Sequence, residues 1–407
     1  MCMLKHYIEF SRKPLVLSFQ LIFFFIFIPL VISNWFGNSS LEKIIYFFIT
    51  FSIFSFLAEF SFLFLYRLTT GNSYQFVKKI DFKKIAYEPH PYLPFILKKK
   101  LKRVHGASPT NYPLNKHLSF PQLTSNNMGH YNGDYGDRDV LTPKPKDLIR
   151  INCLGGSTTG NYIKTDEKNY SYPLELERIL SKKVDKNVEV NNFGQGGYNS
   201  ADLLVRFALQ NIDTKPDYII IYHAYNDIRA YLTPGFSSDY FHSRKNLGEV
   251  YWKYYLGSKL PNIPISFLNY LINKYLFPLK ERTTILEVIE KKELDPKQNY
   301  SKGLLTYERN IQHIIDLCKN NNIKVILGTF CFYLYSDIKN DPLHKLYQKI
   351  VSEENEVIKK LATKNNLTLV DCSKIIPRED SYFVDSSHFT PKGMSLLAKS
   401  FADKIDL

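Results

Sequence analysis

The chain has 407 residues, 44% of them apolar, and its 53 Lys+Arg against 39 Asp+Glu give a net charge of +14. This length allows two or three domains, or one large domain with additions, and the apolar content excludes a disordered chain. A basic balance fits nucleic acid, an anionic membrane surface or solvated lysines. The sequence holds no recognisable nucleic-acid module, so no nucleic-acid partner is expected, and membrane lipids are favoured.

Two apolar segments lie near the start of the chain. Residues 14–33 contain no charge, and residues 44–66 are interrupted only by Glu59. About 20 apolar residues span the hydrocarbon of a bilayer, so residues 1–70 are predicted to form a hairpin of two transmembrane helices. The first segment is too long for the core of a signal peptide, and no small-residue cleavage site follows it.

Basic residues lie before the first segment and after the second, whereas the link between them holds only Lys43. The positive-inside rule then puts both termini and the soluble body on the cytoplasmic side of the membrane. Residues 71–147 are polar and dotted with proline, and are interpreted as a connecting segment. They include the basic run 98–103, which fits either contact with anionic headgroups or a solvated face.

From residue 148 to residue 407, short apolar strands alternate with amphipathic helices. Strands are predicted at residues 149–154, 188–193, 218–222, 325–329 and 367–371. Such alternation implies a mainly parallel sheet with helices on both faces. The exception is the aromatic-rich stretch 232–304, which is too long for an ordinary connection and is predicted to be a helical insertion.

Three helices of this body have clear signals. One carries apolar residues at i, i+3, i+4 and i+7, namely Ile311, Ile314, Ile315 and Cys318. Asp341 and Thr390 each precede a proline, which is the pattern of an N-cap followed by proline in the first turn. The helix after Asp341 carries an apolar stripe of Leu346, Ile350, Val357 and Leu361.

The five cysteines are odd in number, scattered and set mainly in apolar surroundings. This pattern is not a disulfide framework, and without a CxxC pair it does not suggest a metal site. No metal and no cofactor are expected. Cys153 lies inside a predicted strand and is interpreted as a core residue, not as a nucleophile.

Polar or glycine-rich motifs follow four of the predicted strands, where ligands bind in a parallel α/β sheet. Ser157 follows the first strand in a glycine turn that can expose its hydroxyl. Gly194 follows the second strand and Asn226 follows the third. Asp385 and His388 come from the loop after the last strand.

A serine hydroxyl becomes nucleophilic when a base accepts its proton, and a histidine base needs a partner that orients its ring. The spacing of Asp385 and His388 lets one loop place the carboxylate on one ring nitrogen and leave the other nitrogen facing Ser157. The turn at Ser157 is not a GxSxG elbow, which disfavours the α/β-hydrolase fold. No lysine follows it, which excludes a P-loop.

These four motifs, in this order, resemble the SGNH (GDSL-type) hydrolase family over residues 148–407, apart from the insertion. The resemblance implies a three-layer α/β/α fold with a mainly parallel, flavodoxin-like sheet. It also implies that Ser157 is the nucleophile, His388 the general base and Asp385 the residue that orients it. The oxyanion hole would then be formed by the backbone N–H groups of Ser157 and Gly194 and the side-chain amide of Asn226.

Two positions depart from the family pattern. The first motif reads Gly-Gly-Ser where Gly-Asp-Ser is usual, and Ala224 stands where a glycine usually lies two residues before Asn226. The added methyl group bears on how closely that loop approaches a substrate. Similarity to membrane-anchored members extends upstream to residues 89–92 and 127–129.

The favoured function is a membrane-anchored serine esterase that removes an acyl group from a glycan, a lipid or another ester through an acyl-enzyme. An O-acyltransferase would use the same triad and pass the acyl group to a sugar hydroxyl. A catalytically silent binding or scaffold protein is the third hypothesis, and its signature would be a missing triad residue. The sequence does not fix the oligomeric state.

Overall fold

The computed structural model describes residues 28–71, 86–102, 104–105, 114–115, 118, 122–165, 168–244 and 294–407. These residues fall into two compact units, an apolar helical pair at residues 28–71 and an α/β body that contains the rest. Most of the predicted first membrane segment and most of the predicted insertion at 232–304 lie outside the described residues.

The helical pair consists of α3 (Ile28–Phe36) and α4 (Ser40–Thr70), which pack against each other across a short link. The Ser39 side chain caps the start of α4, and Gly71 ends it in the left-handed region (φ 73°). Apolar side chains of α4 are exposed, with Phe56 at 71%. Among the described helices, α4 is the one long and apolar enough to cross a membrane.

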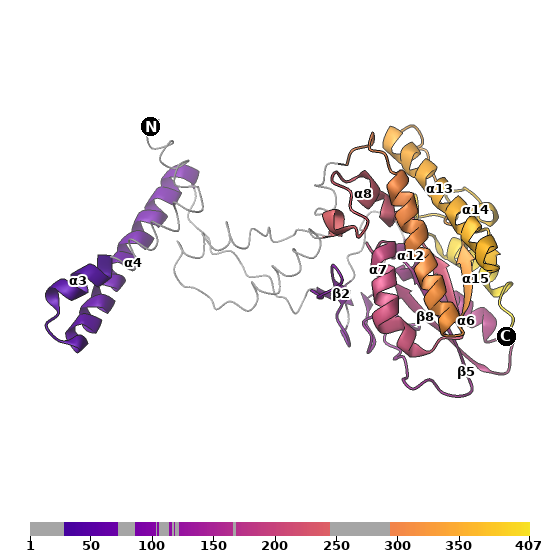
Figure 1. Cartoon of the computed structure of the whole chain (residues 1–407), viewed down its shortest axis with the longest axis horizontal. Helices are drawn as coiled ribbons and strands as arrows, with labels where there is room; N and C mark the ends of the chain where they lie inside the picture. Colours follow the sequence, from indigo (N-terminus) through magenta and orange to yellow (C-terminus); the bar gives the residue numbers. More distant parts are fainter. Residues whose placement is uncertain are drawn as a thin grey trace. The chain divides into compact units, whose positions relative to one another are not determined.

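A five-stranded parallel sheet in the order β8–β5–β9–β10–β11 forms the centre of the body (Figure 1). Its strands are β5 (Leu148–Gly155), β8 (Asn187–Gly194), β9 (Tyr218–Tyr222), β10 (Lys324–Gly328) and β11 (Thr368–Val370). Each of the predicted strands is confirmed, with small shifts at the ends. In chain order this is the 2-1-3-4-5 arrangement of flavodoxin-like sheets.

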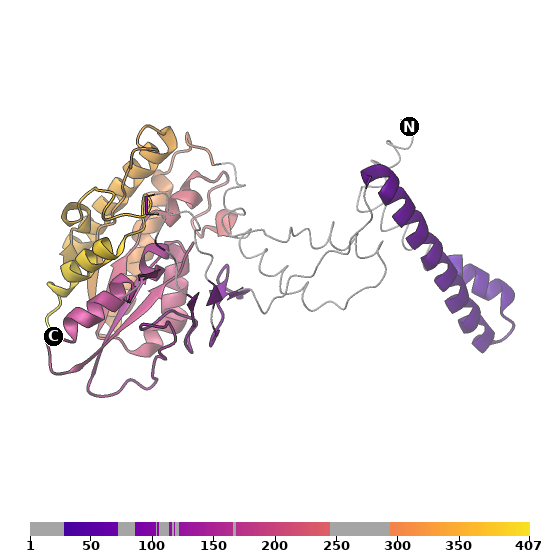
Figure 2. The ribbon, with the colours of Figure 1, turned by 180° about the vertical axis from the view of Figure 1, so that it is seen from behind.

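Helices cover both faces of this sheet. They are α5 (Ser157–Gly160), α6 (Tyr172–Leu180), α7 (Ser200–Arg206), α8 (Asn226–Leu232), α12 (Ser301–Asn320), α13 (Pro342–Asn365), α14 (Cys372–Ile375) and α15 (Pro391–Ala402). A π-helical turn (Phe207–Asn211) and a 3₁₀ turn (Ile212–Thr214) continue α7. The pair α6 and α15 lies on one face, and α7 and α12 lie on the other (Figures 1 and 2).

The predicted helix signals are confirmed with one adjustment. The apolar stripe on α12 is fully buried, and Asp341 and Thr390 cap α13 and α15 with their side chains. On α13, Ile350 is fully buried, but Leu346 and Val357 lie at the edge of the buried face. The buried face of α13 is therefore rotated slightly from the predicted stripe, and it includes the carboxyl group of Glu354.

Short antiparallel pairs flank the sheet. They are β1 (Tyr87–Glu88) with β2 (Ile96–Leu97), β3 (Val104–His105) with β4 (Gln122–Leu123), and β6 (Ile163–Lys164) with β7 (Asn169–Tyr170). The first two pairs belong to the segment before the sheet. Its residues from Leu93 to Leu97 are buried, so this part of the upstream segment packs into the core of the body.

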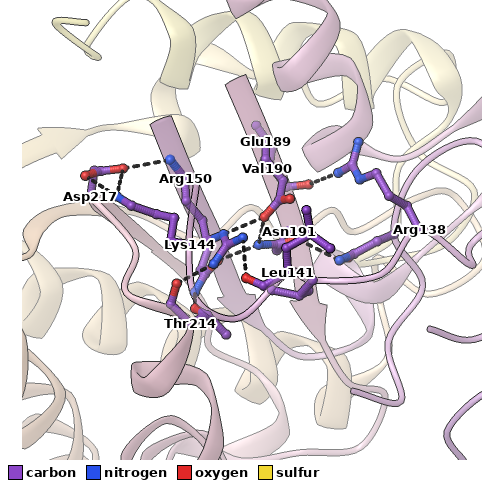
Figure 3. A network of polar contacts seen from close by, with 12 residues as sticks. Arg138, Leu141, Lys144, Arg150, Glu189, Val190, Asn191, Thr214 and Asp217 are labelled. Atoms are coloured by element: carbon purple, nitrogen blue, oxygen red, sulfur yellow. Dashed lines mark hydrogen bonds and ion pairs between the residues drawn. The ribbon is translucent and has the colours of Figure 1, made fainter. Parts of the chain in front are cut away.

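A buried polar network joins the same upstream segment to the amino ends of β5 and β8 (Figure 3). The Arg150 side chain is fully buried, pairs with Glu189, and donates to the backbone carbonyls of Leu141 and Thr214. The Asn191 amide donates to the same Glu189 carboxylate at 2.9 Å. A buried guanidinium needs such complete pairing because an unpaired buried charge is costly.

Replacing Glu189 by alanine should lower the free energy of unfolding by about 3–5 kcal/mol, because Arg150 would keep its charge in the core without its partner. The matched control is Asp403→Ala, which breaks the ion pair of Asp403 with Lys183, whose side chains are 53% and 46% exposed. That change should cost less than about 1 kcal/mol. Denaturant unfolding of both variants in detergent measures the difference, and equal losses would contradict a buried ion pair.

Candidate active site

The carboxyl ends of three neighbouring strands lie level with one another. Gly155 at the end of β5 pairs with Gly194 on one side and with Tyr222 on the other. The order of the strands along the chain reverses around β5, and such a switch point is where parallel α/β sheets bind ligands. Residues that follow these strands are therefore brought to one place.

The first of these residues is Ser157, which begins the short helix α5 directly after β5. A Cβ atom on Gly155 would lie 2.1 Å from Thr159 Oγ1 and 2.4 Å from the Tyr222 carbonyl oxygen, so only glycine fits there. Thr158 and Thr159 are buried, whereas Ser157 is partly exposed. The glycine turn thus presents Ser157 at the surface of a tightly packed strand end, as the sequence predicts.

The second element is the loop after β8. A Cβ atom on Gly196 would lie 3.7 Å from Ser157 Cβ, so this loop runs directly beside the serine. The Gly194 N–H, predicted as an oxyanion donor, donates to Asn192 Oδ1 at 3.1 Å. Gly194 is therefore next to the site, but its N–H group is engaged in this structure.

The third element is the turn that carries Asn226. Tyr225 has φ 62° and ψ −51°, and the Asn226 N–H donates to the Ala224 carbonyl oxygen at 2.6 Å, which is a γ-turn with positive φ. Such turns are strained, and residues held in sparsely populated backbone regions cost about 1–3 kcal/mol each. The Asn226 amide donates to the Tyr198 carbonyl oxygen at 2.8 Å. It lies 2.5 Å from the Cβ position of Gly156, the residue before Ser157.

A buried carboxyl group supports this strained turn. Glu354 on α13 is fully buried, and its Oε2 accepts the Tyr225 N–H at 3.2 Å. Its Oε1 accepts the Tyr231 hydroxyl at 2.8 Å. Burial, reinforced by the charge of Asp227, raises the pKa of Glu354 to about 8. Glu354 was not predicted from the sequence. Its position, four residues after Ile350 on the apolar stripe, does indicate a carboxyl group on the buried face of the helix.

A second buried pair lies behind Asn226. His223 Nε2 and Asp227 Oδ2 are 2.7 Å apart, and both side chains are almost fully buried. Asp227 also accepts the Ser200 N–H at 2.9 Å, which ties the turn to the start of α7. Nothing in the local sequence pattern indicates the pairing of Asp227 with His223.

The Asp385–His388 pair forms as predicted. His388 Nδ1 lies 2.8 Å from Asp385 Oδ2, and the N–H groups of Ser387 and His388 both donate to Asp385 Oδ1 at 2.8 Å. The His388 carbonyl accepts the Val384 N–H at 2.9 Å, which closes the loop behind the ring. The two side chains are 26% and 22% exposed, so the pair is mostly buried but reaches solvent.

The pKa values of this pair move apart. Burial alone would lower the pKa of His388, but the charge and hydrogen bond of Asp385 outweigh it and raise that pKa above its ordinary value. Burial would raise the pKa of Asp385, and the charge and hydrogen bond of His388 with the two backbone donors lower it instead. The carboxylate form of Asp385 is therefore stabilised over a wide pH range.

The structure brings Ser157, the Gly194–Gly196 loop and Asn226 together, and separately joins Asp385 to His388. The rings of Tyr225 and Phe332 stack 5.6 Å apart, and the Tyr333 N–H donates to the Ser386 carbonyl oxygen at 2.8 Å, so the C-terminal loop lies near the Asn226 turn. Among the described residues, no hydrogen bond joins the Ser157 hydroxyl to the His388 ring. Cys153 is fully buried and its thiol pKa is raised by that burial, in agreement with a core role.

Comparison with known proteins gives a family match. The sequence model of the GDSL-like Lipase/Acylhydrolase family matches residues 153–396. No curated protein is similar enough to the chain to be matched.

The solved structures matched by this chain include a lipase/acylhydrolase from Enterococcus faecalis, at 17% identity and TM-score 0.37, covering 63% of this chain and 95% of that one. A catalytic mutant of an acetylxylan esterase from Geobacillus stearothermophilus has 17% identity and TM-score 0.38, with coverages of 63% and 93%. A GDSL-like lipase from Bacteroides thetaiotaomicron has 18% identity and TM-score 0.36, with coverages of 65% and 92%.

Replacing Asp385 by asparagine should lower the pKa of His388, because the neutral amide removes the charge that opposes burial. The matched control is Asp341→Asn, since Asp341 pairs with His344 at the same three-residue spacing at the start of α13. NMR titration of the imidazole groups measures both variants. An unchanged His388 pKa in Asp385→Asn would contradict the assigned pairing. An equal shift of the His388 pKa in Asp341→Asn would contradict it as well.

Proposed function

Because this chain belongs to the GDSL-like lipase/acylhydrolase family, we propose that it is a serine esterase anchored in a membrane. It would remove an acyl group from a glycan, a lipid or another ester. The observation that carries the proposal is that the Asn226 amide lies beside Gly156, the residue before Ser157, at the level ends of β5 and β9. The sheet would thus position both the proposed nucleophile and the proposed oxyanion donor.

In the proposed reaction, Ser157 Oγ attacks the ester carbonyl carbon while His388 Nε2 accepts the hydroxyl proton. The tetrahedral intermediate collapses, His388 gives the proton to the leaving alcohol, and an acyl-enzyme remains. Water then attacks the acyl group with His388 again as the base, which releases the acid and restores the serine. Asp385 keeps Nδ1 of the ring protonated, so that Nε2 is the nitrogen that accepts.

Two features of the described structure bear on this sequence of steps. The hydrogen bond from Ser157 to His388 has to form when substrate binds, as catalytic hydrogen bonds often tighten only in the complex. The neutral form of His388 is the base, so activity is lost as the pH falls through its raised pKa. Asp385 therefore moves the acid limb of the pH profile upward while it orients the ring.

The developing oxyanion would be held by the Ser157 N–H and the Asn226 amide, each worth about 2.7–4 kcal/mol in comparable sites. The Asn226 amide has two hydrogens, and the bond to the Tyr198 carbonyl occupies one of them and orients the other. For the Gly194 N–H to act as a third donor, it must exchange Asn192 Oδ1 for the substrate oxygen. The three donors come from three strand ends.

Membrane anchoring rests on α4. Its 31 residues extend about 46 Å at 1.5 Å per residue, more than the roughly 30 Å of bilayer hydrocarbon. Its exposed phenylalanine and leucine side chains need an apolar surrounding, which lipid supplies. With the apolar residues 14–33 as a second span, the distribution of basic residues would place the α/β body on the cytoplasmic side. O-acyl transfer and a silent scaffold find no supporting observation among the described residues.

Replacing Ser157 by alanine should abolish hydrolysis of a short-chain activated ester, because the acyl-enzyme cannot form. His388→Ala should do comparable damage, and Asp385→Asn should lose as much or somewhat less. The control is Ser395→Ala on α15. It removes a hydroxyl that donates to Glu175 Oε2 at 3.3 Å, and it should leave activity intact. Full activity in a folded Ser157→Ala protein would overturn the assignment of the nucleophile.

A membrane-impermeant, serine-reactive fluorophosphonate should label the protein in lysed cells and not in intact cells, because the body is proposed to face the cytoplasm. The labelled protein should stay in the membrane pellet after carbonate extraction. The Ser157→Ala variant is the control for labelling at the proposed site. Labelling in intact cells would reverse the proposed orientation, and release by carbonate would contradict anchoring.

A further inference from the structure

The loop between Gly194 and Asn199 connects the proposed active site to a part of the chain outside the family match. One side of this loop meets the site, because Gly196 lies beside Ser157 and the Tyr198 carbonyl accepts the Asn226 amide. The other side of the loop meets Phe95 directly, and Arg206 on α7 links the loop to Met128. Phe95 and Met128 both precede the matched residues 153–396.

The strongest contact is made by Tyr198, which is fully buried. Its hydroxyl donates to the Phe95 carbonyl, and the two rings lie 5.6 Å apart. Phe95 is itself fully buried, and its ring tip would be 3.7 Å from a Cβ atom on Gly197, which has φ 79°. A side chain at Gly197 is disfavoured by that φ, so the backbone of the loop can approach the upstream segment closely.

Two further contacts hold the same region. Arg206 on α7 is almost fully buried and donates to Gln195 Oε1 at 3.4 Å and to the Met128 carbonyl at 3.3 Å. Arg244 pairs with Asp202 on α7 at 2.7 Å and donates to the Tyr92 carbonyl at 2.9 Å. Both upstream stretches are therefore tied to the loop and to the helix that follows it.

We infer that the segment upstream of the family domain is part of the catalytic unit, and that Tyr198 is a positioning residue for the oxyanion donor Asn226. The path is short and continuous. The Phe95 carbonyl fixes the Tyr198 hydroxyl, this fixes the Tyr198 backbone, and its carbonyl fixes one hydrogen of the Asn226 amide. The other hydrogen then points in one direction, where an oxyanion would bind.

The physical reason for such support is the strain at the preceding residue. The γ-turn at Tyr225 leaves Asn226 on a backbone that would relax if its contacts were loosened. Glu354 restrains the turn from the α13 side, and Tyr198 restrains the amide from the loop side. A displacement of about 1 Å in a reacting group can cost about 100-fold in rate, so modest loosening is measurable.

This inference rests on the proposed function, and its test is Tyr198→Phe in the full-length protein. The variant deletes the bond to Phe95 and keeps the ring and the backbone carbonyl. We expect kcat to fall by about 10- to 100-fold with KM little changed, because the bond acts on the transition state. Affinity for phenylboronic acid, whose tetrahedral adduct with serine mimics the oxyanion, should fall with kcat. Asn226→Ala removes the amide donor itself, and its loss of kcat, about 10²- to 10³-fold, is the upper limit of the effect.

The matched control is Tyr162→Phe. Tyr162 is equally buried, and its hydroxyl also donates to an upstream backbone carbonyl, that of Tyr131 at 2.7 Å, but it does not contact the Asn226 amide. Both variants delete one buried hydroxyl group that donates to upstream backbone carbonyls, so both should lose similar thermal stability, while kcat should fall only in Tyr198→Phe. If Tyr198→Phe does not fold, Phe95→Leu, which loosens the ring contact, takes its place with the same readouts.

The outcomes separate the two proposals. Activity in Ser157→Ala would contradict the proposed function. The positioning role alone would be overturned by two results together. Ser157→Ala would be inactive, and Tyr198→Phe would have the same kcat and boronate affinity as Tyr162→Phe. A fall in kcat that is matched by Tyr162→Phe would show a general effect of stability and would also overturn it.

Discussion

The register of three parallel strands is the constraint on which the site depends. Gly155 pairs with both Gly194 and Tyr222, so the chain leaves the sheet at one level in three places. Each exit carries one proposed functional group, and the strand spacing fixes how far apart the groups can be. A one-residue slip of any strand would turn its side chains to the other face and separate the groups. The glycine at Gly155 is needed because any Cβ atom there would collide with β9.

The two ends of the sheet use buried polar groups differently. At the amino ends, Arg150 and Glu189 satisfy each other with neutral partners around them, and the result is a rigid junction with the upstream segment. At the carboxyl ends, Glu354 accepts two donors beneath a strained turn and has a pKa raised to about 8. A junction needs complete pairing, whereas an active site stores strain that its surroundings must hold in place.

The upstream segment has a structural role at both ends. It supplies the Leu141 carbonyl to Arg150 at one end and the Phe95 carbonyl to Tyr198 at the other. The sequence reasoning interpreted residues 71–147 as a connecting segment because they are polar, proline-dotted and without periodicity. The Phe95 and Met128 carbonyls meet the side chains of Tyr198 and Arg206, which lie 103 and 78 positions away. No local pattern can encode such contacts.

The sequence by itself determined the strands, the capped helices and the apolar length of α4, and it predicted candidate site residues after the strands. These features are local: they follow from periodicity, N-cap chemistry, and polar residues placed after buried strands. Tertiary structure decided the rest. It placed the Glu354 carboxyl group and the His223–Asp227 pair behind Asn226, and it paired the Gly194 N–H with Asn192 Oδ1. It also gave Asp341 and His344, at the start of α13, the same pairing as Asp385 and His388. Spacing fixes which side chains can meet, but only packing fixes which partners they find, because a partner distant in sequence leaves no periodic trace.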